Sequence, residues 1–115
     1  MKNLKIIALI LLVITVTSCE SNTYEEVSGV VANPTYTKNV QPIISANCVR
    51  CHNSGASSQS ISLENYVDVK AAVNSYGLIC RIEGSNCGDV MPQSGRMPQT
   101  TIDLIKRWVN QGLIN

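Results

Sequence analysis

The chain has 115 residues, with nine lysines and arginines against eight aspartates and glutamates, which gives a formal net charge of +1. This length fits one small domain, and the near balance of charge excludes the basic surface that proteins need to bind nucleic acid. The aromatic residues are four tyrosines and one tryptophan, with no phenylalanine. The chain therefore brings few large side chains to a core that is already small.

The first 18 residues have the pattern of a secretory signal peptide. Lys2 and Lys5 precede an apolar run, residues 6–14, that is too short to remain as a transmembrane helix. The sequence Val-Thr-Ser-Cys at residues 16–19 resembles a bacterial lipobox, which predicts cleavage before Cys19 and acylation of this cysteine. We therefore expect a lipoprotein of the cell envelope, anchored in a membrane through Cys19 and facing the periplasm or the cell surface. The alternative is an ordinary signal peptide, in which Cys19 has no special role.

The mature chain divides into two parts by composition. Residues 19–34 are mostly polar, and we predict a lipidated N-terminus followed by a flexible tether. Residues 35–115 carry the periodic apolar pattern and form the predicted domain. Export to an oxidising compartment also permits disulfide bonds in this domain.

Three helices are predicted within the domain, over residues 37–51, 63–74 and 99–111, because apolar side chains recur there at helical spacing. Thr37 is the expected N-cap of the first helix, and Asn65 is the expected N-cap of the second. No stretch shows a convincing strand pattern. The predicted fold class is therefore all-α.

The first predicted helix runs into the motif Cys48-Val49-Arg50-Cys51-His52, which has the pattern of a haem c attachment site. The two cysteines would form thioether bonds to the haem, and His52 would bind the iron as its proximal ligand. The same C-x-x-C spacing occurs in zinc sites and in thiol–disulfide enzymes. His52 is the only histidine of the chain. It stands at the one position that the haem motif requires, which favours haem over both alternatives.

The second axial ligand must come from another residue type, because the chain has no second histidine. Two methionines remain after removal of the signal peptide, Met91 and Met97, and each is followed by proline and glutamine. We assign Met91 as the distal ligand because Pro92 stiffens the backbone beside it. Met97 lies directly before the third helix, where we expect it to pack onto that helix. It is the second choice as ligand.

Two further cysteines, Cys80 and Cys87, fall in a predicted loop over residues 78–96. The glycine, serine and asparagine between them favour a turn, and we predict that the two cysteines form a disulfide. In the chain-entropy model, so short a loop stabilises the fold by ~2.5 kcal/mol. The disulfide would also anchor the segment that precedes Met91.

The order of these motifs carries a family resemblance that covers residues 35–115. The segments that carry it are Tyr36–Ile44, Cys48–His52, Met91–Pro92 and Ile105–Gly112. Together they resemble the small class I c-type cytochrome domains of bacterial envelope lipoproteins. The resemblance implies a class I cytochrome c fold, with three or more helices around one covalently bound haem c and with the first and last helices packed across each other. It also implies His52 and Met91 as the axial ligands.

The activity that the resemblance implies is the transfer of single electrons between redox proteins of the cell envelope. We therefore expect an electron carrier and not an enzyme. The pair Cys80 and Cys87 and the second Met-Pro at Met97 depart from the family pattern. The alternative function is a haem-based sensor or ligand-binding protein, in which the distal position is vacant or Met91 is easily displaced.

Overall fold

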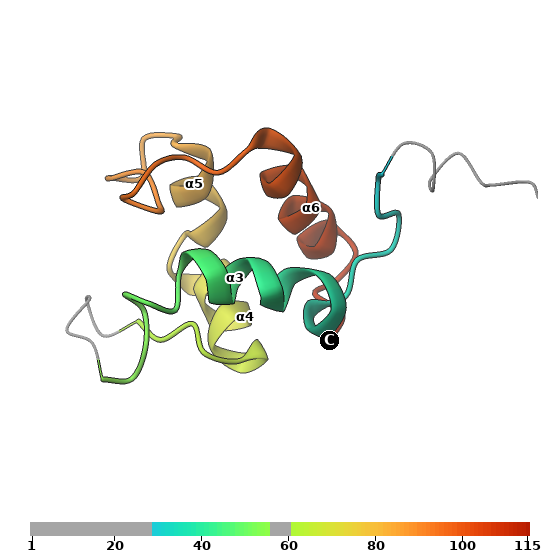
Figure 1. Cartoon of the computed structure of the whole chain (residues 1–115), viewed down its shortest axis with the longest axis horizontal. Helices are drawn as coiled ribbons and strands as arrows, with labels where there is room; N and C mark the ends of the chain where they lie inside the picture. The colour runs from blue at the N-terminus through green and yellow to red at the C-terminus, as the bar shows by residue number, and fades with distance from the viewer. Residues whose placement is uncertain (1–28, 56–60) are drawn as a thin grey trace, which may run out of the picture.

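The computed structural model describes residues 29–55 and 61–115, and in this part of the chain all regular elements are helices, without strands. The elements are η1 (Tyr36–Val40), α3 (Gln41–Asn47), α4 (Tyr66–Ser75), α5 (Leu78–Glu83) and α6 (Gln99–Asn110). Helix α6 packs against η1 and α5, and α5 also packs against α4 (Figure 1). The prediction of an all-α fold is thus confirmed for the described residues.

Two predictions concern residues outside the described ranges, namely the signal peptide over residues 1–18 and the acylation of Cys19. In the described part of the chain, no helix is both long enough and apolar enough to cross a membrane.

The first helix begins earlier and ends earlier than the sequence predicts. Thr35, and not Thr37, is its N-cap, because the Thr35 hydroxyl accepts a hydrogen bond from the Lys38 amide at 3.4 Å. The helix starts with the wide turn η1 and continues without a break as α3, which ends at Asn47. Cys48 leaves the helical region with φ −123°. The two cysteines of the haem motif therefore follow the helix in a turn and do not lie within it.

The second and third predicted helices lie close to their expected positions. Asn65 caps α4 as predicted, and its side chain accepts a hydrogen bond from the Asp68 amide at 3.0 Å. The same asparagine donates to the Asp68 carboxylate at 2.8 Å. Helix α6 begins at the predicted residue, Gln99, and ends one residue before the predicted end. Gly112, with φ 95°, provides the positive φ that the chain needs directly after this helix.

Helix α5 lies inside the stretch that the sequence analysis treats as a loop. It is bounded by Gly77 and Gly84, which both have left-handed backbone angles, with φ values of 67° and 78°. Leu78 and Ile82, one helical turn apart, are buried. A helix of six residues is too short to give a clear period, which explains why the sequence does not reveal it.

One continuous hydrophobic core joins all five elements. Its buried members are Tyr36, Val40, Ile44, Leu63, Val69, Ala72, Leu78, Ile82, Met97, Ile102, Ile105, Trp108 and Leu113. Trp108 is fully buried, and its indole Nε1 donates to the Ile114 carbonyl at 2.7 Å. Its ring centroid lies 5.9 Å from that of Tyr36, which in turn lies 5.4 Å from that of Tyr66. Two tyrosines, Tyr36 and Tyr66, thus extend the core from the tryptophan.

The start of the domain is fastened to its C-terminal end. The Tyr36 amide donates to the Ile114 carbonyl at 2.8 Å. The Thr37 hydroxyl, which does not cap the helix, donates to the Asn115 side chain at 3.0 Å. Arg107 on α6 donates to the Val31 carbonyl at 2.7 Å. Contacts with the domain therefore begin several residues before residue 35, where the sequence analysis places the end of the tether.

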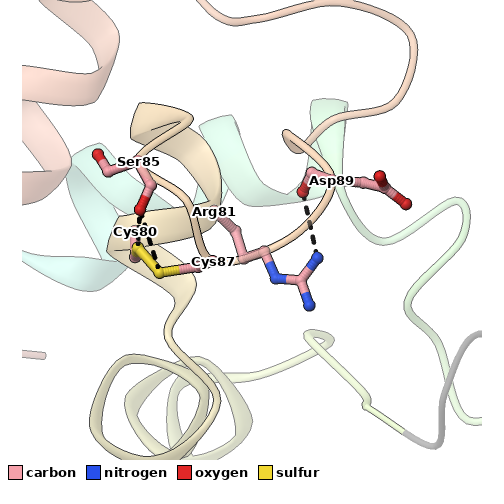
Figure 2. Close-up of a disulfide and its surroundings, with 5 residues drawn as sticks. All are labelled: Cys80, Arg81, Ser85, Cys87 and Asp89. Carbon is pink, nitrogen blue, oxygen red and sulfur yellow. Dashed lines mark hydrogen bonds between the residues drawn. A yellow bond between two sulfur atoms is a disulfide. The ribbon is translucent and has the colours of Figure 1, made fainter.

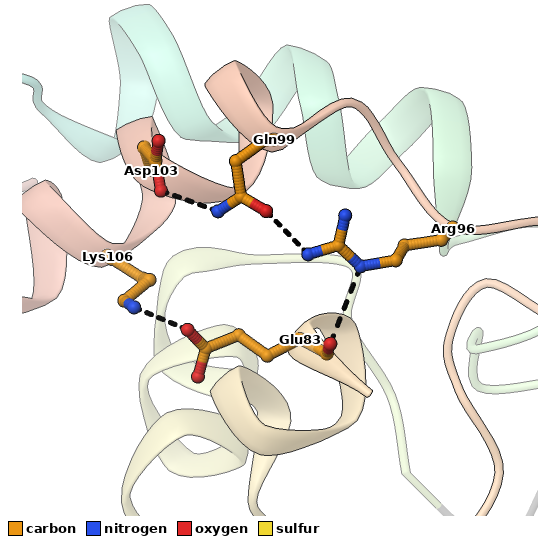
Figure 3. A network of polar contacts seen from close by, with 5 residues as sticks. All are labelled: Glu83, Arg96, Gln99, Asp103 and Lys106. Carbon is orange, nitrogen blue, oxygen red and sulfur yellow. Dashed lines mark hydrogen bonds and ion pairs between the residues drawn. The ribbon is translucent and has the colours of Figure 1, made fainter. Parts of the chain in front are cut away.

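A polar network links α5 to the beginning of α6 (Figure 3). Glu83 at the end of α5 forms an ion pair with Lys106, and the Glu83 carbonyl accepts a hydrogen bond from Arg96 at 3.4 Å. Arg96 also donates to Gln99, which donates to Asp103 at 2.8 Å. Exposed pairs of this kind contribute little to stability. These contacts join α5 and the segment that follows it to α6.

Candidate functional site

A cavity of about 510 Å³ lies where three separate stretches of the chain meet. The first stretch is the end of α3 with the turn after it, the second runs from residue 61 through α4 into α5, and the third is residues 91–94. Apolar side chains form much of the lining, including Ile44, Leu63 and Ile82. Pockets for cofactors typically measure ~300–1,000 Å³ and have largely apolar walls, so this cavity has the dimensions and the chemistry of such a pocket.

The structure brings Cys48, Cys51, His52 and Met91 together on the wall of this cavity. The first three follow one another in the turn after α3, whereas Met91 comes from the irregular segment between α5 and α6. The cavity thus collects the residues that the sequence analysis assigns to haem attachment and to both axial positions.

The imidazole of His52 is oriented by the backbone of residue 61. Its Nδ1 lies 3.2 Å from the Ile61 carbonyl oxygen, and because a carbonyl can only accept, Nδ1 must carry the proton of this hydrogen bond. In the neutral imidazole the Nε2 atom then has the free lone pair, which is the state that binds a metal. The main chain strengthens the arrangement, since the Leu63 amide donates to the His52 carbonyl at 2.9 Å. The sequence alone does not reveal this contact.

The two cysteines of the motif differ in their surroundings. Cys48 is half-buried and packs against the core, whereas Cys51 is exposed. Burial raises the pKa of the Cys48 thiol to about 11, so at neutral pH this thiol is almost entirely protonated. A thiol–disulfide enzyme needs the opposite, a first cysteine whose pKa is lowered so that the thiolate can attack. The environment of Cys48 therefore argues against a thiol-exchange function.

In the described part of the chain, the zinc alternative does not find the additional ligands that it would need. Structural zinc sites take four ligands, mostly cysteine and histidine. Cys80 and Cys87, which could have provided two of them, are bonded to each other. Within residues 29–55 and 61–115, no three or more histidine, cysteine, aspartate or glutamate side chains are grouped so that they could hold a metal ion.

The two candidate methionines occupy different environments. Met91 is half-buried and lines the cavity, and its peptide bond to Pro92 is cis. Met97 is only 5% exposed, belongs to the hydrophobic core, and is not among the residues that line the cavity. It directly precedes the N-cap of α6, and Ile102 of that helix belongs to the same core cluster. This placement matches the packing role that the sequence analysis gives to Met97.

The disulfide between Cys80 and Cys87 joins α5 to the segment that leads to Met91 (Figure 2). The two Cα atoms are 5.9 Å apart, and the backbone turns back between them through Asn86, whose φ is 57°. Both sulfur atoms lie near the Ser85 carbonyl oxygen, at 3.0 and 3.5 Å. The bond therefore closes a tight turn immediately before the Met91 side of the cavity.

We expect the double variant Cys80→Ser/Cys87→Ser to be less stable than the wild type by ~2.5 kcal/mol, because the unfolded chain regains the freedom that the closed loop removes. Denaturant unfolding of both proteins under oxidising conditions measures this difference. A dithiol reductant should lower the midpoint of the wild type and leave that of the double variant unchanged. Equal stability of the two oxidised proteins would contradict a stabilising role for the bond.

Arg50, Tyr76 and Arg81 are among the lining residues that the sequence analysis does not assign to the site. Arg50 lies within the haem motif and Tyr76 follows α4, while Arg81 comes from α5, the helix that the sequence does not reveal. Of these three residues, only Arg50 could have been placed at the site from the sequence, because it stands between the two cysteines of the motif.

Comparison with known proteins adds no further assignment. No protein-family model matches the chain, and neither a curated protein nor a solved structure matches it. The function must therefore be inferred from the chemistry of the cavity itself.

Proposed function

We propose that the chain is a mono-haem c-type cytochrome that transfers single electrons between redox proteins of the cell envelope. One observation carries the proposal: Cys48, Cys51, His52 and Met91, which lie in two distant parts of the sequence, line the same largely apolar cavity. The hydrogen bond from His52 Nδ1 to Ile61 adds to this, because it leaves Nε2 free to bind a metal.

The residues at the cavity have separate roles in this proposal. Cys48 and Cys51 hold haem c through thioether bonds, His52 is the proximal iron ligand and Met91 is the distal one. Haem c supplies an iron that accepts and releases one electron, and a methionine ligand raises its reduction potential. The chain's own residues orient the imidazole, present the thioether sulfur and surround the site with apolar side chains that limit water. None of these roles requires a general acid or a nucleophile.

The proposal includes the fold and the location of the domain. The packing of α6 against η1, at the start of the first helix, agrees with the crossed first and last helices of a class I cytochrome c fold. Acylation of Cys19 would hold the domain at a membrane of the envelope, where its donor and acceptor proteins would meet it. No nucleic acid and no substrate enters this scheme.

Expression in a cell that can mature c-type cytochromes tests the proposal. We expect the wild-type protein to retain haem on a denaturing gel, because thioether bonds survive denaturation. The spectrum should be that of a low-spin iron with a methionine-to-ferric charge-transfer band. The double variant Cys48→Ser/Cys51→Ser is the matched control, and it should show no haem stain.

Two outcomes would count against the proposal in different ways. A colourless wild-type protein, from cells that mature other c-type cytochromes, would exclude haem attachment altogether. A high-spin ferrous form that takes up carbon monoxide at once would show that the distal position is open. That result would favour the haem-based sensor or ligand-binding protein over the electron carrier.

A further inference from the structure

Arg81 contacts the Met91 segment through both its main chain and its side chain. The Met91 amide donates to the Arg81 carbonyl at 3.0 Å, and the Arg81 guanidinium Nη1 donates to the Asp89 carbonyl at 3.2 Å. Figure 2 shows the side chain extending from α5 across to the main chain of residue 89. One residue of a regular helix thus fixes an otherwise irregular segment at two points, one of which is the backbone of Met91 itself.

The backbone of this segment is shaped to receive the guanidinium. A Cβ atom at Gly88 would lie 2.5 Å from Nη1 and 2.8 Å from Cζ of Arg81, so a side chain at this position would displace the guanidinium. Gly88 also has a φ of 101°, which side-chain-bearing residues rarely adopt. The backbone angle favours glycine at the residue against which the guanidinium packs.

The contact depends on the main chain of residue 89 and not on its side chain. In Figure 2 the carboxylate of Asp89 points away from the guanidinium, and only the carbonyl oxygen accepts the hydrogen bond. Removing the charge of Asp89 should therefore leave the contact intact. This makes Asp89→Asn a matched control for any change at Arg81.

We propose that Arg81 is a positioning residue that holds the segment from Gly88 to Met91 so that the Met91 sulfur stays at the cavity. The inference rests on the proposed function, because Met91 is there the distal ligand. A charge-assisted hydrogen bond is worth about a factor of ten or more in an equilibrium constant. Loss of the Arg81 side chain therefore raises, by about this factor, the fraction of molecules in which Met91 is away from the iron.

Exogenous imidazole measures this fraction, because it binds the ferric iron only when the distal position is free. We expect the apparent Kd for imidazole to be about tenfold lower in the Arg81→Gln holoprotein than in the wild type. Asp89→Asn should change it by less than about twofold, and so should Arg107→Gln, which removes an arginine that donates to the Val31 carbonyl at the other end of the domain. The Arg81→Lys variant, which keeps the charge, should fall between Arg81→Gln and the wild type.

A double-mutant cycle separates positioning from a direct effect of the arginine on the cavity. In a Met91→Ala background no methionine competes with imidazole, so Arg81→Gln should leave the Kd unchanged. If Arg81→Gln shifts the Kd by the same factor in both backgrounds, then Arg81 acts on the incoming ligand, and the positioning role is overturned.

Hydrogen exchange of the Met91 amide tests the inference independently of the iron ligand. This amide donates to Arg81, and we expect it to exchange about tenfold faster in the Arg81→Gln holoprotein and at the wild-type rate in Asp89→Asn. Unchanged exchange in Arg81→Gln would overturn the inference even if the haem and its ligands are as proposed. A wild-type protein without a methionine-to-iron band would instead contradict the ligand assignment, while the exchange rate would still decide whether Arg81 holds the segment.

Discussion

Replacing Met91 by alanine is expected to abolish the methionine-to-ferric charge-transfer band while the haem stays attached through Cys48 and Cys51. Met91 is the methionine that lines the cavity, so under the proposed ligation its removal would leave the iron with His52 as its ligand from the described chain. Because methionine ligation raises the reduction potential, the potential of Met91→Ala should also be lower than that of the wild type. Absorption spectra of the ferric protein and a redox titration measure the two effects.

The Met97→Ala variant should lose stability but keep the charge-transfer band. Met97 is almost completely buried in the hydrophobic core, and truncation of a buried methionine costs roughly 2–5 kcal/mol of the free energy of unfolding. The charge-transfer band should persist in the folded protein. Loss of the band in Met97→Ala alone, with the band intact in Met91→Ala, would show that the two methionines have been assigned the wrong way round.

Trp108→Ala should be among the most destabilising single substitutions in the domain. The indole is fully buried and donates to the Ile114 carbonyl at 2.7 Å, so alanine leaves both a large cavity and a lost hydrogen bond. Truncation of a buried tryptophan typically costs roughly 3–5 kcal/mol, which is a large part of the stability of so small a domain. Denaturant unfolding followed by circular dichroism measures the loss.

Two further variants test whether the loss of stability in Trp108→Ala comes from the buried indole ring. Trp108→Phe keeps an aromatic ring, and the Ile114 carbonyl retains the Tyr36 amide as a donor, so its loss of stability should be clearly smaller. Val67 on α4 is 70% exposed, and Val67→Ala should change the free energy of unfolding by less than about 0.5 kcal/mol. A loss in Trp108→Ala no larger than that in Val67→Ala would show that the tryptophan is not the centre of the core.

Helix α6 and helix α5 show which parts of the fold the sequence can predict. Helix α6 is long, with a continuous apolar stripe, and this periodicity predicts its first residue correctly. Helix α5 has six residues between two glycines, so its burial results from contacts with α4 and α6 that a local pattern does not contain. The cap of the first helix was assigned to Thr37 for a similar reason. Thr35 and Thr37 are both acceptable N-caps locally, and the contact of Thr37 with Asn115 is a long-range one.

The candidate site shows the same division between local and long-range information. The motif Cys48–His52 is contiguous, so the proposal of haem attachment can be made from the spacing of its residues alone. The choice between Met91 and Met97 depends on tertiary packing, because both are followed by the same two residues. The hydrogen bond from His52 to Ile61 and the role of Arg81 likewise depend on how separate segments approach each other, which no local pattern specifies.

Hydrogen bonds join the two ends of the domain at the start of the first helix. From there the helix runs for twelve residues, from Tyr36 through Asn47, before the chain reaches Cys48 at the cavity. This corresponds to roughly 17 Å along the helix axis. In Figure 1 residues 29–35 and the C-terminus both lie at the end of the domain from which this helix departs. Under the proposed acylation of Cys19, changing the number of residues between Cys19 and residue 29 should therefore alter how far the cavity lies from the membrane without altering the proposed iron ligands. On this proposal, the distance from the membrane and the redox chemistry can be varied independently in the same chain.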